Sequence, residues 1–189
     1  MREILADIRR DDQRASEVIR RLRSVLKKTP FGMKYLDLNE TVRQVIGILA
    51  AVAHGRDIVL KCVTTPADLN VKGDAVQLQQ VILNLIINAM DAISEAQAKE
   101  REICITTDLS GAGAEIKVSD TGPGIAPDGI KNVFDPFFTT RSQGMGMGLA
   151  IVRTIVEAHH GKSSAENQSS GGALFTIRFP VARGRSTSV

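Results

Sequence analysis

The stretch that decides the fold is VILNLIINAMD, residues 81–91, in which two asparagines interrupt an apolar run. At 3.6 residues per turn, Asn84 and Asn88 share one helix face, and Asp91 extends that face by a turn. Asparagine is unfavourable in mid-helix, and burying its amide unpaired costs about 1–3 kcal/mol. We therefore expect a polar partner here. A carboxamide oxygen suits Mg²⁺, while solvent-facing amides or a polar link between helix and sheet remain alternatives for this motif alone.

The patterns on either side of this helix predict an α+β domain. Asp74 begins the helix, with Gln77 completing a capping box. Further helices are expected over residues 39–53, capped by Asn39, over 149–160, and briefly near 129–133. Short apolar or alternating runs predict strands at 35–38, 57–63, 69–72, 102–109, 114–119 and 173–179. This order of elements predicts a two-layer α/β sandwich with a mixed sheet.

The chain has 189 residues, 43% of them hydrophobic and 24% charged, which are globular values. The apolar run 45–53 is too short to cross a bilayer, so no membrane segment is expected. Cys62 and Cys104 lie far apart without metal-ligand spacing, and we expect two reduced, half-buried thiols in a cytoplasmic protein.

The net charge of +3 does not indicate nucleic-acid binding. Residues 1–28 hold nine basic and five acidic side chains, a balance of +4, so the rest of the chain sums to −1. The chain has one Tyr and no Trp, and its sequence has no basic patch with interleaved aromatic residues on which bases could stack. The basic excess is better explained as the solvated face of one long helix, which ends at the Pro and Gly of residues 29–32.

A second motif is IKVSDTGPGI, residues 116–125. A predicted strand carries Asp120 into a turn where Gly122 and Gly124 allow a ligand to approach the backbone closely. An ionised carboxylate only accepts hydrogen bonds, so Asp120 can receive the exocyclic amine of adenine and would repel the carbonyl of guanine. An ordinary Asp-Gly turn is the alternative.

The third motif is TTRSQGMGMGL, residues 139–149. Its alternate glycines run into a helix whose first N–H groups and dipole form an anion site, with Arg141 and the threonine hydroxyls in reach of phosphates. The spacing fits neither a Walker A loop nor a dinucleotide fingerprint. The preceding FDPFF, residues 134–138, is an aromatic hinge that could anchor a mobile lid.

Together these motifs resemble, in order, the N, first glycine, F and second glycine boxes of sensor histidine kinases, over roughly residues 35–180. The amino-acid sequence of residues 144–160 is most similar to that of nitrogen-regulation and oxygen-sensing kinases. The resemblance implies the Bergerat ATP-binding fold, shared with gyrase, heat-shock chaperone and mismatch-repair ATPases. That fold is a mixed five-stranded sheet backed by three helices, with Mg-ATP between the asparagine-bearing helix and a flexible lid.

The resemblance also implies roles for individual residues. Asn88 would hold Mg²⁺, Asn84 would assist at the phosphates, Asp120 would read adenine, and Asp91 would lie near the base. The residues expected at the nucleotide are Asn84, Asn88, Asp91, Asp120, Gly122, Gly124, Ile125, Thr140, Arg141, Gly144, Gly146, Gly148 and Leu149. The sequence departs from the commonest pattern in having Met145 in place of Thr and Arg141 in place of Lys.

Hydrolytic relatives and serine-kinase anti-sigma factors carry Glu as a general base at the position of Asn84. An amide cannot take a proton at neutral pH, so we expect slow hydrolysis and ATP kept for transfer. The histidines are His54, His159 and His160, and none lies upstream of the ATP-binding domain, where the resemblance implies a phosphoacceptor helix. We therefore expect nucleotide binding without self-labelling.

The resemblance predicts three segments. Residues 1–30 would be the second helix of a dimerisation hairpin without its phosphoacceptor helix, 31–182 the catalytic domain, and 183–189 a flexible tail. The expected activity is transfer of the γ-phosphate of Mg-ATP to a histidine outside this chain, for relay to a response regulator.

The expected partners are that phosphoacceptor helix, the dimer partner of the same kinase and the response regulator. The segment is expected in the cytoplasm, although an upstream part could attach the full-length protein to a membrane. The alternative is a nucleotide-switched interaction module without phosphotransfer, which a separate histidine-bearing helical domain would test.

Overall fold

The structure is a computed structural model that describes residues 32–111, 113–139 and 145–181. The chain divides into compact units of residues 1–31 and 32–189, and the description concerns the second. The long helix expected over residues 1–28 and the tail expected over 183–189 lie outside the described residues.

The described part of the chain contains three helices and seven strands. They are β1 (Lys34–Asp37), α2 (Leu38–His54), β2 (Val59–Val63), β3 (Asn70–Gly73), α3 (Ala75–Glu95), β4 (Glu102–Ser110), β5 (Gly113–Asp120), α4 (Gly148–Ala158), β6 (Lys162–Asn167) and β7 (Ala173–Pro180).

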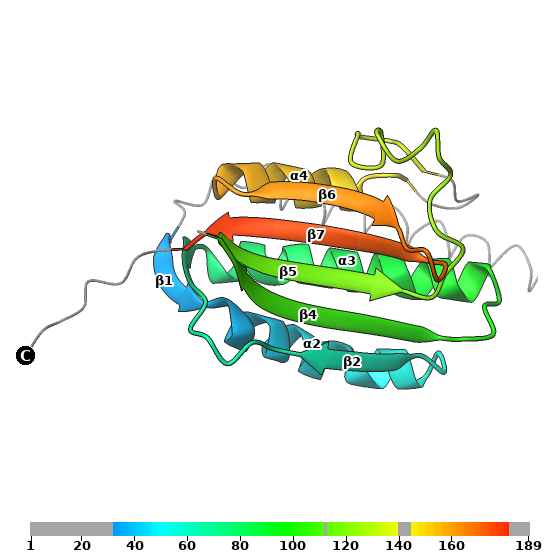
Figure 1. Cartoon of the computed structure of the whole chain (residues 1–189), viewed down its shortest axis with the longest axis horizontal. Helices are drawn as coiled ribbons and strands as arrows, with labels where there is room; N and C mark the ends of the chain where they lie inside the picture. Colours follow the sequence, from blue (N-terminus) through cyan, green and yellow to red (C-terminus); the bar gives the residue numbers. More distant parts are fainter. Residues whose placement is uncertain (1–31, 112, 140–144, 182–189) are drawn as a thin grey trace, which may run out of the picture. The chain divides into compact units, whose positions relative to one another are not determined.

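Five strands form one sheet in the order β2-β4-β5-β7-β6, and β1 pairs separately with β3. Strands β2 and β4 are parallel and the other neighbours are antiparallel, so the sheet is mixed. Helices α2, α3 and α4 lie together on one side of it (Figure 1). The predicted α+β sandwich, with a five-stranded mixed sheet backed by three helices, is confirmed.

Helix α3 is the central helix of the core. One of its faces buries eight side chains, at Leu78, Val81, Ile82, Leu85, Ile86, Ala89, Met90 and Ile93. Alternate strand residues such as Ile105 and Ile116 complete the core from the sheet. Among the described residues, α3 alone is long and apolar enough to cross a membrane, and its buried face accounts for that composition.

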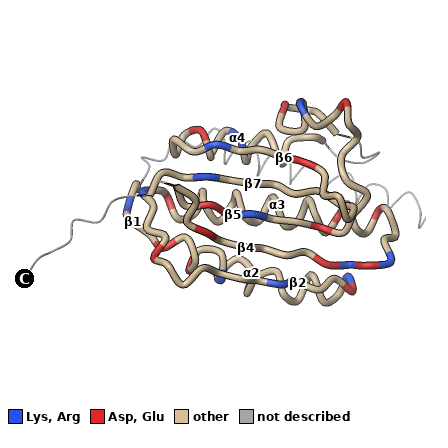
Figure 2. The backbone as a smooth tube through the Cα atoms, viewed as in Figure 1, with Lys and Arg blue, Asp and Glu red and all other residues tan. Residues whose placement is uncertain are grey.

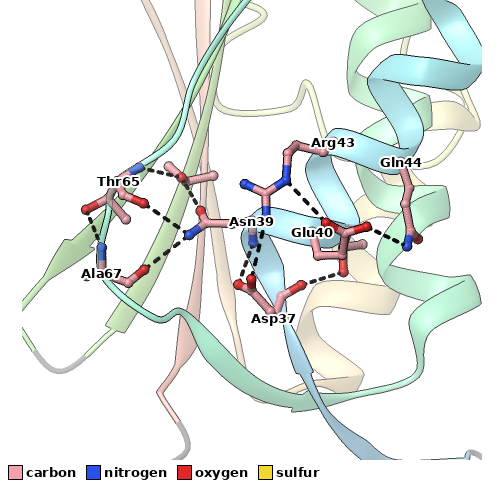
Figure 3. Close-up of polar contacts among 9 residues, drawn as sticks. Asp37, Asn39, Glu40, Arg43, Gln44, Thr65 and Ala67 are labelled. Atoms are coloured by element: carbon pink, nitrogen blue, oxygen red, sulfur yellow. Dashed lines mark hydrogen bonds and ion pairs between the residues drawn. The ribbon is translucent and has the colours of Figure 1, made fainter.

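The start of α2 corrects the predicted cap. The side chain of Asp37, not Asn39, caps the helix by accepting a hydrogen bond from the Asn39 amide at 2.9 Å. Asn39 instead reaches across to the segment after β2, donating to the carbonyls of Thr65 and Ala67 at 3.2 and 3.1 Å (Figure 3). Its oxygen also accepts from Thr107 at 2.6 Å. The prediction was wrong because the Asn39 side chain binds residues far away in the sequence and is not available to cap the helix.

The start of α3 confirms Asp74 as its cap, since the carboxylate accepts from the Gln77 amide at 3.1 Å. Gln77 does not complete the capping box. The Asp74 N–H donates instead to Nε2 of His159, at 3.0 Å.

Two local predictions were wrong between β5 and β7. Residues 129–133 form successive turns and not a helix. The Gly129 amide donates to the Ala126 carbonyl and the Asn132 amide to the Gly129 carbonyl, so each hydrogen bond spans three residues and closes a turn. Strand β6 was missed because its sequence, KSSAEN, is polar and lies at a sheet edge, where no apolar alternation is needed.

Charged side chains recur along the strands (Figure 2). Lys61 pairs with Glu102 at 2.6 Å, and Glu115 contacts both Lys117, at 2.7 Å, and Arg178. The two cysteines are free thiols on neighbouring strands, as expected, although Cys62 is exposed rather than half-buried.

Candidate functional site

The polar face of α3 is opposite the face that it buries in the core. Asn84, Asn88 and Asp91 lie on it at intervals of four and three residues, each half-buried. The side-chain amide of Asn84 donates to the carbonyl of Gly148 at 3.4 Å. Since Gly148 is the first residue of α4, the asparagine face meets the end of the second glycine-rich stretch at this point.

Asp120 is the last residue of β5, and its side chain is buried at 4% exposure. One carboxylate oxygen, Oδ1, accepts from the Gly122 amide at 2.8 Å and from the Ala173 amide at 3.4 Å. These main-chain bonds hold the carboxylate at the end of the strand. They give it a fixed orientation, as a group that reads a base edge requires.

The first glycine-rich turn rests against α3. A Cβ added at Gly122 would lie 3.4 Å from the Cβ of Ala92 and 2.8 Å from Oδ1 of Asp120. The absence of a side chain therefore allows the Asp120 carboxylate to approach the Gly122 backbone, while the turn lies at van der Waals distance from the helix. Ala92 is eight residues beyond Asn84, or about 12 Å along the helix axis. The two glycine-rich segments thus meet α3 at separate points about a nucleotide's length apart.

The second glycine-rich stretch is joined to the FDPFF segment. Gly146 has φ +63°, and a Cβ there would lie 2.5 Å from main-chain atoms of both Phe137 and Phe138. Its carbonyl accepts from the Phe137 amide at 3.1 Å. Phe134 is buried edge-on against Phe175, while Phe137 is 75% exposed at φ +66°. The aromatic segment is thus anchored at Phe134 and presents Phe137 outward.

Met147, the residue before α4, makes no side-chain hydrogen bond to the first amides of the helix. Of the other residues predicted here, Leu149 packs partly buried against the core. Thr140, Arg141 and Gly144 lie outside the described residues.

Asp91 makes a contact that its sequence position does not predict. Its carboxylate forms an ion pair with Arg56, from the turn after α2, with 2.7 Å between Oδ1 and Nη1. Arg101 supports this turn by donating to the Arg56 carbonyl at 3.0 Å and to the Ser94 hydroxyl at 3.4 Å. Asp91 lies next to Ala92, so the ion pair is at the Gly122 end of the polar face.

The structure brings a further group of residues to the site that sequence reasoning missed. Asn167 and Gln168, at the end of β6, hydrogen-bond the main chain of Ile125 and Asp120 respectively. Arg56 joins Asp91 across 35 residues of sequence. None belongs to a periodic pattern or a motif, so no local signal identifies them.

The donor set of this site suits a nucleotide with Mg²⁺. Carboxamide oxygens from α3 are hard ligands, and Mg²⁺ takes its remaining ligands from phosphates and water. Among the residues that the structure describes, no cluster of three or more His, Cys, Asp or Glu side chains could hold a metal. The turn after the buried Asp120 carboxylate approaches α3 near Ala92, and the start of α4 contacts α3 at Asn84.

Comparison with known proteins finds a matching family, similar sequences and similar structures. Residues 73–183 match the family described as histidine kinase-, DNA gyrase B- and HSP90-like ATPases. The sensor histidine kinase TmoS of Ectopseudomonas mendocina is 39% identical over 183 residues, which are 96% of this chain but 19% of TmoS. The chain therefore spans about a fifth of that relative's length.

Solved structures resemble the fold as well. The catalytic domain of histidine kinase ThkA is 32% identical, with a TM-score of 0.70 over 81% of this chain and 97% of that domain. ThkA in complex with the response regulator protein TrrA is 28% identical, with a TM-score of 0.76 over 93% of this chain and 49% of ThkA.

Proposed function

Because the chain belongs to the histidine kinase-, DNA gyrase B- and HSP90-like ATPase family, we propose that it is the ATP-binding catalytic part of a two-component sensor histidine kinase. The observation that carries the proposal is the polar face of α3, which meets Gly148 at Asn84 and approaches Asp120 through the Gly122–Ala92 contact. Residues 31–182 are the catalytic domain, 1–30 the second helix of a dimerisation hairpin, and 183–189 a tail. The domain works in the cytoplasm.

ATP lies along the polar face of α3. Asp120 accepts the exocyclic amine of adenine, and Gly122, Gly124 and Ile125 form the turn around the base. Asn84 and the α4 amides at Gly148 and Leu149 bind the phosphates. The remaining phosphate contacts come from Thr140, Arg141, Gly144 and Gly146. Asn88 offers its amide oxygen to Mg²⁺, whose chemistry is to neutralise phosphate charge.

Asp91 lies near the base. Its carboxylate is engaged by Arg56, and the pair borders the base end of the site. Direct contact with the nucleotide then falls to Asp120 and the glycine-rich turn.

The reaction is transfer of the γ-phosphate to a histidine outside this chain. Phosphoryl transfer needs positioning and charge neutralisation more than covalent participation by the protein. Asn84 cannot take a proton from water at neutral pH, so the site holds ATP for transfer rather than hydrolysis. The phosphoryl group then passes from that histidine to a response regulator, the kind of partner named in the ThkA complex. The other partner is the phosphoacceptor helix of the kinase dimer.

A calorimetric titration with ADP and with GDP, both in the presence of Mg²⁺, tests the site. We expect ADP to bind at least about tenfold more tightly, a difference of about 1.4 kcal/mol, because Asp120 accepts from adenine and repels the guanine carbonyl. Asp120→Asn should remove most of this preference. Asp108→Asn, an exposed carboxylate on β4, is the matched control and should retain it. Equal affinity for both nucleotides, or no binding of either, would contradict the proposal.

A further inference from the structure

The turn between β6 and β7, residues 168–172, lies at the same end of the sheet as the end of β5 (Figure 1). It is closed on itself, since the Gln168 amide donates to the Gly172 carbonyl and the Gly171 amide to the Gln168 carbonyl, both at 3.0 Å. This closed turn, together with Asn167 and Ala173 on either side of it, meets the proposed base-binding segment through three separate sets of contacts.

The first set involves the side chain of Asn167. Its Oδ1 accepts from the Ile125 amide and its Nδ2 donates to the Ile125 carbonyl, each at 2.7 Å. One side chain therefore satisfies both main-chain groups of Ile125, as a neighbouring strand would. The fit requires Gly124, where φ is +79° and an added Cβ would lie 2.8 Å from the Asn167 oxygen.

The second and third sets involve Asp120 itself. The Gln168 side-chain amide donates to the Asp120 carbonyl at 3.2 Å, and the Ala173 amide donates to the Asp120 carboxylate at 3.4 Å. Gly172, at φ +84°, passes so close that an added Cβ would lie 1.8 Å from the Asp120 carbonyl oxygen. Both the main chain and the side chain of Asp120 are therefore held by this turn.

We propose that the β6–β7 turn is the positioning element for base recognition, with Asn167, Gln168 and Gly172 setting the orientation of the Asp120 carboxylate and the shape of the Gly122–Ile125 turn. The inference rests on the proposed nucleotide site and deepens it. Asp120 is paired with Ile103 of β4 on one side, but pairing of β5 with β7 on the other side ends at Ser119 and Leu174, so the sheet register does not reach Asp120 from β7. The turn continues the restraint beyond the last paired residues.

The consequence concerns specificity as well as stability. Asp120 distinguishes adenine from guanine only if a carboxylate oxygen lies within about 2.7–3.2 Å of the exocyclic group at a suitable angle. A displaced carboxylate loses the bond to adenine without gaining one to guanine. Loosening the turn should therefore weaken ADP binding, leave GDP binding nearly unchanged and so reduce the ratio between them.

The main test compares Gly172→Ala with Gly171→Ala. Both glycines have positive φ, +84° and +93°, so both substitutions strain the backbone. Only Gly172 approaches Asp120, whereas an added Cβ at Gly171 meets nothing within 4 Å. The dissociation constants for ADP and GDP with Mg²⁺ are measured by calorimetry, and the melting temperature of the nucleotide-free protein is recorded. We expect Gly172→Ala to weaken ADP binding by about tenfold or more, and Gly171→Ala to remain within about twofold of wild type.

Milder variants keep the test decisive if Gly172→Ala does not fold. Asn167→Ala and Gln168→Ala each remove hydrogen bonds to the base-binding segment without backbone strain, and each should weaken ADP binding about fivefold. Ser169→Ala, an exposed side chain in the same turn, is their control and should bind ADP as wild type does.

Two outcomes overturn the inference. One leaves the proposed function standing, and the other overturns the proposed function as well. If the variants lower the melting temperature while ADP affinity and the ADP-to-GDP ratio stay at wild-type values, the turn is merely structural and the proposed function stands. If wild-type protein binds neither nucleotide, both the inference and the proposed function fail.

Discussion

Glu115 illustrates at the scale of one residue how a buried carboxylate can stay charged. It lies on β5, where it contacts Lys117 and Arg178. Burial raises the pKa of this carboxyl, but hydrogen bonds from the two cations outweigh that effect, and the pKa remains below its ordinary value. The ion pairs therefore contribute to folding only while Glu115 is ionised.

This predicts a pH-dependent contribution to stability. A carboxyl with a depressed folded-state pKa stabilises the fold above its unfolded pKa of about 4.3, and the contribution is lost as the pH falls through the folded pKa. The free energy of unfolding, measured in urea from pH 7 to pH 3, should therefore differ most between wild type and Glu115→Gln at pH 7, and the difference should shrink in acid. Glu166→Gln, exposed on β6, is the control. A difference that stays constant over this range would contradict the argument.

At the scale of elements, His159 joins the end of α4 to the start of α3. Its ring is 2% exposed and uses both nitrogens. Nδ1 lies 2.8 Å from the Ile155 carbonyl and donates to it, which leaves Nε2 to accept the Asp74 amide at 3.0 Å. The ring also packs edge-on against Phe179 of β7. The histidine thereby hydrogen-bonds a carbonyl in the last turn of α4 and the amide of the residue that caps α3.

Replacing His159 should loosen this junction. His159→Ala leaves the amide of the half-buried Asp74 without its acceptor, so we expect the free energy of unfolding to fall by about 1–3 kcal/mol. His160→Ala is the matched control, because the neighbouring side chain is exposed and should change stability by no more than about 0.5 kcal/mol. Equal losses in the two variants, measured by urea unfolding, would show that the junction contributes nothing specific.

At the scale of the whole molecule, the proposed kinase activity needs a partner. We expect no acid-labile label on the chain when it is incubated alone with ATP labelled at the γ-phosphate. We expect labelling of a separate histidine-bearing helical domain supplied in trans. Basal hydrolysis in the same assay should stay far below about 10 per second, because Asn84 is not a base.

Two outcomes of that assay would contradict this account. Stable acid-labile labelling of the chain itself would show that it carries its own phosphoacceptor. Nucleotide binding without any transfer to the histidine-bearing domain would favour the alternative, a nucleotide-switched interaction module.

The sequence alone determined those features that depend on neighbours within a few residues. The three- and four-residue spacing of Asn84, Asn88 and Asp91 placed them on one face of a helix, and Asp74 was recognisable as its cap. Alternation within β4 and β5 placed Asp120 at a strand end. These signals are readable because helix and strand periods map sequence directly onto a face.

The tertiary structure alone decided which distant groups complete the site. Asn167 binds Ile125 across 42 residues, Gln168 binds Asp120 across 48, and Arg56 pairs with Asp91 across 35. Asn39 was misassigned as a cap for the same reason. Polar side chains such as these carry no periodic signature, and their partners are chosen by how the sheet and helices pack. The sequence therefore determined which residues could do chemistry, and the packing decided which residues hold them in place.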